Sequence, residues 1–197
     1  MLRSRAVGAD YPDGIRVAPS ILSADFGRLG EQVQTVLDAG GIVDVHLMIE
    51  RPERQVAEFA KAGADSITVH YEATPHVHYA LGMVKDAGCR AGLAINLSTP
   101  IEGARLVQDD LDLVLCMTIN PGWGGQKLVP ASLVKCAALR EVLADHVTIE
   151  VDGGVDPVTG PQCTAAGARF LVAGSFVFGA DDPAAAYAQL VDATKAV

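Results

Sequence analysis

The chain has 197 residues, half of them hydrophobic, which is enough to bury the core of one domain. Its 24 acidic residues outnumber its 15 basic ones, and the net charge of -9 argues against nucleic acid as a partner, although helix N-termini can still bind a small phosphorylated ligand. No apolar run approaches the roughly 20 residues of a membrane-spanning helix, so we expect a soluble protein with no membrane partner.

The first residues and the cysteines predict a cytoplasmic location. Residues 1–14 contain no apolar stretch typical of a secretion signal, so we interpret them as an N-terminal extension before a single domain at 15–197. Cys89, Cys116, Cys136 and Cys163 lie far apart, without a C-x-x-C pair or the dense spacing of a disulfide scaffold. We expect buried, reduced thiols.

Short apolar runs alternate with helical segments, several of which end in Ala-Gly. The predicted strands are 15–21, 43–48, 66–70, 91–96, 111–118, 147–152 and 169–173. The predicted helices are 25–39, 53–62, 76–88, 101–108, 131–144, 157–166 and 183–196. The strands are almost continuously apolar, as in a parallel sheet that is buried on both faces.

Polar residues stand at the ends of most of these strands, among them Ser20, His46, His70, Asn96, Asp152 and Ser175. In a β/α barrel all such ends open on one face, whereas an open doubly wound sheet gathers its ligand groups at one switch point. We therefore predict an α/β fold of the TIM (β/α)8 barrel type.

A TIM barrel needs eight strand–helix units and commonly about 250 residues, but the sequence contains seven units. The first predicted helix ends near Gly40, and the next strand begins at Val43. One β/α unit is therefore missing between Gly40 and Val43.

A glycine-rich loop at 120–126 follows one predicted strand and precedes a helix, so its backbone can approach an anion. An ordinary long turn would have a similar composition. Trp123 favours a loop that closes over a ligand and excludes water.

Asp152 ends a strand and is followed by Gly153 and Gly154. Such an aspartate can be a helix cap, but here the two glycines would also let backbone N–H groups face a substrate. Gly174 and Ser175 repeat the arrangement one strand later, where TIM barrels bind phosphate.

His46 and Met48 share one face of their strand. A lone strand histidine is commonly structural, but His46 could meet Asp152 as a metal ligand for zinc, iron or manganese. His70 is a weaker candidate, because no ligand spacing follows it. Met48 and Met117 could be core residues, or they could line a reacting centre.

Together these segments resemble the ribulose-phosphate 3-epimerase family. The residues that carry the resemblance are 18–26 (APSILSADF), 44–48 (DVHLM), 120–126 (NPGWGGQ), 151–154 (VDGG) and 173–175 (AGS). Their shared order makes the combination far more specific than any single motif.

The resemblance implies interconversion of D-ribulose 5-phosphate and D-xylulose 5-phosphate by proton transfer at C3 through an enediolate, in the pentose phosphate pathway. It implies that Asp152 is an acid/base and a metal ligand, that His46 is a second ligand, and that one divalent cation is the cofactor. It also implies a homo-oligomer. The substrate contacts that it implies are Ser20, His46, Met48, Met117, Gly122, Trp123, Gly124, Gly125, Asp152, Gly153, Gly154, Gly174 and Ser175.

The sequence departs from the family in one place. The family's His-x-Asp pair followed by Met-Asp-Gly is absent, and with it the second acid/base and half of the metal ligands. If the unit is truly deleted, and not only absent from the printed sequence, the alternative is a non-catalytic phosphate-binding relic. A further alternative is an epimerase of a ketohexose 6-phosphate, because the motifs do not specify the length of the sugar. The related decarboxylases and synthases would require an Asp-x-Lys-x-x-Asp array, which the sequence lacks.

Overall fold

A computed structural model describes residues 14–20, 26–28, 30–31 and 43–195. Every predicted strand is present, most of them slightly shorter than expected. The strands are β1 (Arg16–Pro19), β2 (Asp44–Leu47), β3 (Ser66–His70), β4 (Arg90–Ile95), β5 (Leu113–Met117), β6 (Thr148–Asp152) and β7 (Phe170–Ala173). All six pairings between neighbours are parallel, which confirms the predicted sheet type.

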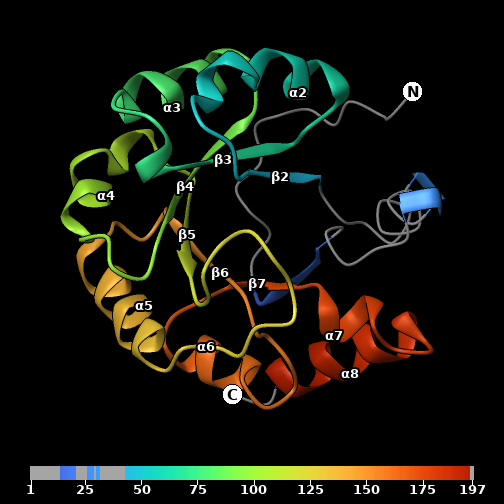
Figure 1. Ribbon diagram of the computed structural model, residues 1–197. Helices are drawn as coiled ribbons and strands as arrows, with labels where there is room; N and C mark the ends of the chain where they lie inside the picture. The colour runs from blue at the N-terminus through green and yellow to red at the C-terminus, as the bar shows by residue number, and fades with distance from the viewer. Residues whose placement is uncertain (1–13, 21–25, 29, 32–42, 196–197) are drawn as a thin grey trace.

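The strand order is β1-β7-β6-β5-β4-β3-β2. Consecutive strands are neighbours except at one place, since β1 and β2 form the two edges of the sheet. An eight-stranded barrel would have one more strand between them. The opening in the sheet therefore lies where the sequence predicts the missing unit, and Figure 1 shows the curled sheet with its helices on the outside.

The helices lie close to the predicted ranges. They are α2 (Val56–Ala62), α3 (Val77–Asp86), α4 (Glu102–Leu106), α5 (Ala131–Val142), α6 (Gly160–Ala165), α7 (Ser175–Phe178) and α8 (Pro183–Lys195), with 3-10 turns η2 (Phe26–Arg28), η3 (Pro52–Arg54), η4 (Tyr71–Ala73) and η5 (Gln108–Asp110). The sequence did not predict α7. Most of the predicted helix at 25–39 lies outside the described residues, as do residues 1–13 of the predicted extension.

The Ala-Gly pairs end helices as predicted. Gly63 follows α2 with a φ of 105°, and its N–H donates to the carbonyl oxygens of Ala60 and Phe59. This left-handed conformation is nearly free of strain for glycine alone. Gly88 and Gly167 also have positive φ angles after their helices.

Both faces of the sheet are buried. On β5, Val114 and Cys116 belong to the large core between the sheet and the helices. The alternate residues Leu113, Leu115 and Met117 form a second apolar cluster inside the curl. This division explains why the strand is apolar at every position.

The four cysteines are buried and free, as predicted. Burial raises the pKa of Cys116 to about 11 and the pKa of Cys136 to about 12. These thiols are therefore protonated at neutral pH. None of the described helices is both long enough and apolar enough to span a bilayer.

Candidate active site

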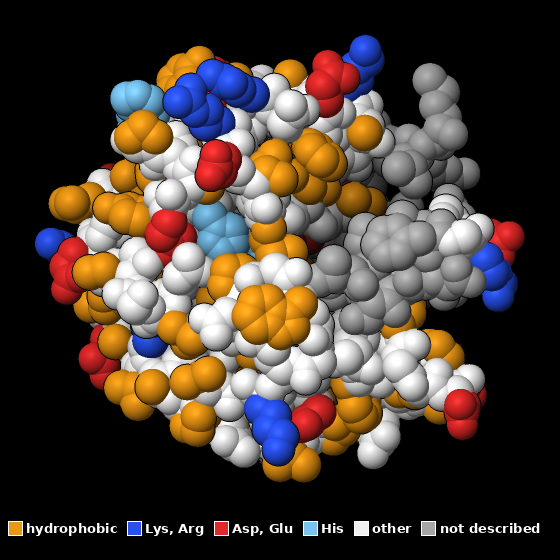
Figure 2. Space-filling model, viewed as in Figure 1, with side chains coloured by type: hydrophobic (Ala, Val, Ile, Leu, Met, Phe, Trp, Pro, Cys, Tyr) orange, Lys and Arg blue, Asp and Glu red, His pale blue; other side chains and the backbone are white. Residues whose placement is uncertain are grey.

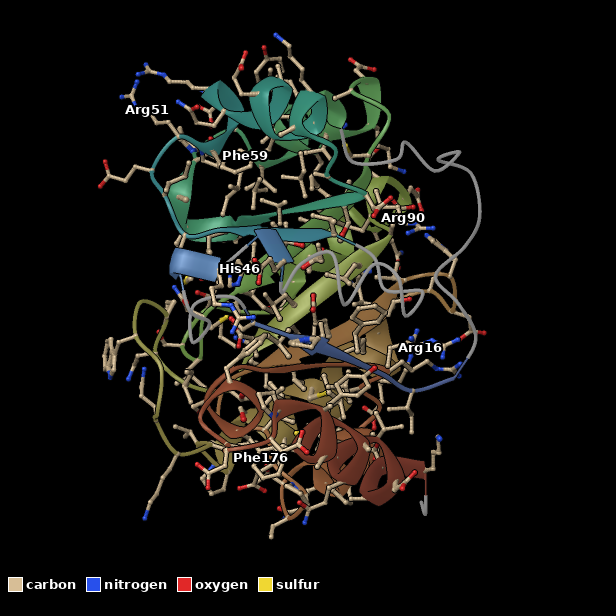
Figure 3. All side chains as sticks on the ribbon, turned by 90° about the vertical axis from the view of Figure 1, so that its right-hand side faces the viewer. Arg16, His46, Arg51, Phe59, Arg90 and Phe176 are labelled. Carbon is tan, nitrogen blue, oxygen red and sulfur yellow. The ribbon has the colours of Figure 1, made fainter. Side chains whose placement is uncertain are left out.

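Parallel strands end on the same side of the sheet, and the predicted site residues lie at that side. Figure 3 shows His46 on the opposite side from Arg16 and Arg90, which begin β1 and β4. Ser20 follows β1, the loop at 120–126 follows β5, and Asp152 ends β6. Chain segments far apart in sequence thus share one face, which we call the mouth.

The structure brings His46 and Asp152 together. His46 Nδ1 lies 3.4 Å from Asp152 Oδ2, and the two side chains are only 14% and 20% exposed. Three strands separate β2 from β6 in the sheet, so this contact exists because the sheet curls back on itself.

This pair fits two positions of a metal centre. Zinc binds histidine nitrogen and carboxylate oxygen at about 2.0–2.2 Å in a tetrahedron, which separates two ligands by roughly 3.4 Å. The distance between His46 Nδ1 and Asp152 Oδ2 matches that spacing. Within the described residues no cluster of three or more His, Cys, Asp or Glu side chains is placed to hold an ion.

His70 joins this pair more closely than the sequence predicted. His70 Nε2 lies 2.7 Å from His46 Nε2, and the two rings are within 24° of parallel. Burial, followed by the neighbouring His46, lowers the pKa of His70, so its ring is neutral at neutral pH. The available signal was that both histidines stand near the ends of consecutive strands, which pair in the sheet.

Glu72 contacts His70 at Nδ1, on the side of the ring opposite the contact with His46. Sequence reasoning did not select this residue. Its Oε2 lies 3.4 Å from His70 Nδ1. Its Oε1 accepts hydrogen bonds from Asn96 N at 2.9 Å and from the Thr99 hydroxyl. Burial alone would raise the pKa of Glu72, but these hydrogen bonds outweigh it and lower the pKa, so Glu72 is ionised.

Lys135 fixes the same loop from the other side. Its ammonium group donates to the carbonyl oxygens of Asn96, Leu97 and Thr99. The loop at 96–99 is thus held between α5 and Glu72. The position of this loop fixes Asn96 N and the Thr99 hydroxyl, which are the two donors that bind the Glu72 carboxylate.

Two acidic residues, Asp44 and Glu150, lie deeper in the interior than the pair of His46 and Asp152. Asp44 and Glu150 occupy the same strand faces as His46 and Asp152, one alternation closer to the strand starts. Burial raises the pKa of both carboxyl groups, and their mutual repulsion adds to the rise for Glu150. Asp44 accepts a hydrogen bond from the Ser66 hydroxyl, whereas both oxygens of Glu150 lack a partner among the described residues.

The glycines after Asp152 are required by close packing. Gly154 has a φ of 66°, and a Cβ there would lie 2.4 Å from Leu128 N. A Cβ on Gly153 would lie 2.1 Å from the Ile119 side chain. Both residues therefore bring backbone close to the glycine-rich loop.

Within that loop, Trp123 is 58% exposed. Gln126 Nε2 donates to the carbonyl oxygens of Asn120 and Trp123 and so braces the loop. Gly122, Gly124 and Gly125 lie in the same exposed turn. An aromatic side chain at the tip of a braced loop is suited to covering a ligand.

The remaining predicted contacts differ in exposure. Met48 is 40% exposed, whereas Met117 is 1% exposed and pairs in register with Asp152. The Ser20 N–H donates to Ala173 O at 3.2 Å, which holds Ser20 beside Gly174 and Ser175. Figure 2 shows a histidine near the centre of the visible face, with hydrophobic side chains to its right and below it and an acidic side chain to its left.

Known proteins with similar sequences identify the family of this chain. The profile of the ribulose-phosphate 3-epimerase family matches residues 41–178. A ribulose-phosphate 3-epimerase of Bacillus subtilis is 41% identical over 204 residues, covering 85% of this chain and 94% of the relative. The chain belongs to the ribulose-phosphate 3-epimerase family. Its fold is also similar to that of 3-keto-L-gulonate-6-phosphate decarboxylase from Vibrio cholerae, with a TM-score of 0.65 at 16% identity over 91% of this chain and 84% of that one.

The relatives also account for the opening in the sheet. The Bacillus subtilis alignment spans 204 positions but includes only 85% of this chain, which is about 167 of its 197 residues. A ribulose-phosphate 3-epimerase of Synechocystis gives 42% identity over 211 positions, covering 88% of this chain and 92% of the relative. These family members therefore contain residues that this chain lacks, on the order of one strand–helix unit.

Proposed function

We propose that this ribulose-phosphate 3-epimerase family member uses Asp152 as an acid/base at C3 of the sugar phosphate, with His46 and Asp152 as ligands of one divalent cation. The observation that carries the proposal is the contact of 3.4 Å between His46 Nδ1 and Asp152 Oδ2 at the mouth. Zinc, iron and manganese all suit this donor pair.

The chemistry follows from the position of Asp152. Its carboxylate removes the proton from C3 of D-ribulose 5-phosphate and becomes a carboxylic acid, while the electron pair moves into an enediolate. A bound divalent cation supplies Lewis-acid stabilisation of the enediolate oxygens. Return of a proton to the opposite face of C3 gives D-xylulose 5-phosphate, and the family resemblance assigns that step to an aspartate of the absent unit.

The remaining substrate contacts are proposals of the same kind. Gly174 and Ser175 are suited to the phosphate, because they open a helix beside Ser20. The loop at 122–125 and the backbone of Gly153 and Gly154 would enclose the rest of the ligand. Met48 and Met117 would supply an apolar wall.

The test is an epimerisation assay on metal-depleted protein. We expect turnover of ribulose 5-phosphate to depend on added zinc, iron or manganese and to be abolished by a chelator. Asp152→Asn should reduce turnover by about 100-fold or more, because it removes a positioned acid/base. A parallel assay with a ketohexose 6-phosphate measures the preference for sugar length.

The opening between β1 and β2 favours one alternative, a sugar-phosphate-binding relic without turnover. A chain that binds ribulose 5-phosphate in calorimetry but gives no product with any of the three metals would support the relic. Metal-dependent turnover would exclude it.

A further inference from the structure

We propose that His70 and Glu72 are positioning residues, which fix the tautomer and ring orientation of His46 so that its Nδ1 presents a lone pair beside Asp152. The relevance of this lone pair to metal binding rests on the function proposed above. The arrangement of the two rings and the carboxylate stands on its own geometry.

The three side chains form a continuous chain of short polar contacts. His46 Nε2 and His70 Nε2 are 2.7 Å apart, and His70 Nδ1 is 3.4 Å from Glu72 Oε2. The ring centroids are 4.9 Å apart, much farther than the two nitrogens. The nitrogens therefore face each other between the rings, as a hydrogen bond requires.

A hydrogen bond between the two Nε2 atoms, 2.7 Å apart, can run in either of two directions. One nitrogen of the Nε2 pair must carry a hydrogen and the other must offer a lone pair. In the first arrangement His46 donates through Nε2–H, which leaves the His46 Nδ1 lone pair toward Asp152 and places the His70 proton on Nδ1 toward Glu72. In the second, His70 donates to His46, and the His70 Nδ1 lone pair faces the Glu72 carboxylate.

Glu72 selects the first arrangement. A carboxylate accepts a hydrogen bond from N–H but repels a ring lone pair. Glu72 cannot turn away, because its other oxygen accepts from Asn96 N and from the Thr99 hydroxyl. Metal-ligating histidines are commonly oriented in this way by a partner on their second nitrogen, and here that partner acts through an intermediate imidazole.

The contact with Asp152 alone would favour the opposite tautomer. Asp152 Oδ2 lies 3.4 Å from His46 Nδ1, the same separation as between Glu72 Oε2 and His70 Nδ1, and would accept a hydrogen bond from a protonated His46 Nδ1. Two carboxylates thus compete through a pair of imidazoles. Asn96 N and the Thr99 hydroxyl hold the Glu72 carboxylate in place, which favours the proton on His70 Nδ1. The lone pair therefore remains on His46 Nδ1.

Nitrogen NMR of the metal-free chain tests this assignment directly. Long-range 1H–15N correlations at pH 8, assigned among the five histidines by single substitutions, report which ring nitrogen carries the proton. We expect protonated Nε2 on His46 and protonated Nδ1 on His70. Protonated Nε2 on His70 would overturn the proposal.

Glu72→Gln tests the role of the carboxylate with almost no change in shape. The amide can turn either its oxygen or its nitrogen toward His70, so we expect the tautomer preference to be lost. Glu141→Gln is the matched control, because Glu141 is an exposed glutamate of α5, and its tautomers should equal those of the unaltered chain. Unchanged tautomers in Glu72→Gln would show that Glu72 does not select them.

Titration with Co2+ alone, followed by its visible absorption, measures the consequence for the ligand pair. We expect Glu72→Gln to weaken cobalt affinity by about 10-fold or more relative to Glu141→Gln. Equal affinities would contradict the positioning role. If the unaltered chain binds no cobalt, the proposed metal-assisted function fails, whereas the NMR result still decides the tautomer assignment.

Discussion

At the scale of single residues, Glu150 is the buried side chain with the most unpaired oxygen atoms in the described part of the chain. It is fully buried, both of its oxygens lack a partner among the described residues, and burial raises its pKa well above the ordinary value of 4.5. The folded chain therefore holds a proton on Glu150 at a pH where the unfolded chain has released it. Stability is fully present below about pH 4.5 and falls as the pH rises toward the folded pKa.

We expect Glu150→Gln to remove part of this pH dependence. The amide carries no charge, so the variant should be more stable than the unaltered chain at pH 8, by at least about 1 kcal/mol, with little difference at pH 5. Urea unfolding at the two pH values measures this. A variant that is equally destabilised at both values would show instead that the acid makes a specific contact that the amide cannot replace.

Sequence reasoning reached His46 and Asp152, and His70 as a weaker candidate, but not Glu72, Asp44 or Glu150. Asp152 ends β6 and His46 lies one residue before the end of β2, both within recognisable motifs, whereas Glu72 becomes relevant only because the loop at 96–99 turns back onto it. Glu150 and Asp44 could have been inferred from strand alternation once His46 and Asp152 were assigned to the interior. Their lack of partners depends on the whole interior and is not visible in any segment.

At the scale of elements, the turn after β6 depends on glycine for both its backbone conformation and its close packing. Gly154 has a φ of 66° and lies against Leu128 N. We expect Gly154→Ala to destabilise the chain by about 2 kcal/mol or more, because the left-handed conformation and the backbone clash act together. Thermal unfolding monitored by circular dichroism measures the change.

The control for this prediction is Gly82→Ala within α3. No atom would lie within 4 Å of a Cβ at Gly82, and its helical conformation suits alanine. This variant should be more stable by about 1 kcal/mol. Destabilisation of the same size in both variants would mean that the special geometry at Gly154 is not the cause.

The positions of most elements were predictable, because the apolar runs in the sequence coincide with the buried strands and the Ala-Gly pairs coincide with helix ends. β3 matches its predicted range at both ends, since Ser66 to His70 is bounded by the end of α2 and by η4. α6 begins at Gly160 rather than near Pro157, because Asp156 Oδ1 accepts from the N–H groups of Val158 and Thr159 and forms a separate turn. α7 has only four residues, too few to produce a helical pattern in the sequence.

At the scale of the whole molecule, the sheet is a barrel with one side open. The eight-unit fold and the position of the missing unit were predictable from counting strands, because parallel β/α units alternate regularly. The contact between His46 and Asp152 across the interior was only an expectation, since it depends on how far seven strands curl. The structure keeps that curl although β1 and β2 are both edges.

An open barrel predicts an uneven distribution of local stability. β4, β5 and β6 pair on both sides and have buried side chains on both faces, whereas β1 pairs only with β7 and β2 only with β3 in the described part of the chain. Backbone amides that face the opening lack a strand partner there, so they should exchange hydrogen by small local openings. We therefore expect the slowest exchange in β4 to β6 and the fastest in β1 and β2.

Hydrogen–deuterium exchange followed by mass spectrometry measures this gradient peptide by peptide. Equal protection of β1, β2 and β5 would contradict it, because such protection requires a strand to occupy the opening, either from elsewhere in the chain or from a second copy. Dilution separates these two cases, since protection by a second copy is lost at low protein concentration and protection within one chain is not. Fast exchange at both edges would instead show that β1 and β2 remain unpaired edges of a seven-stranded sheet in solution.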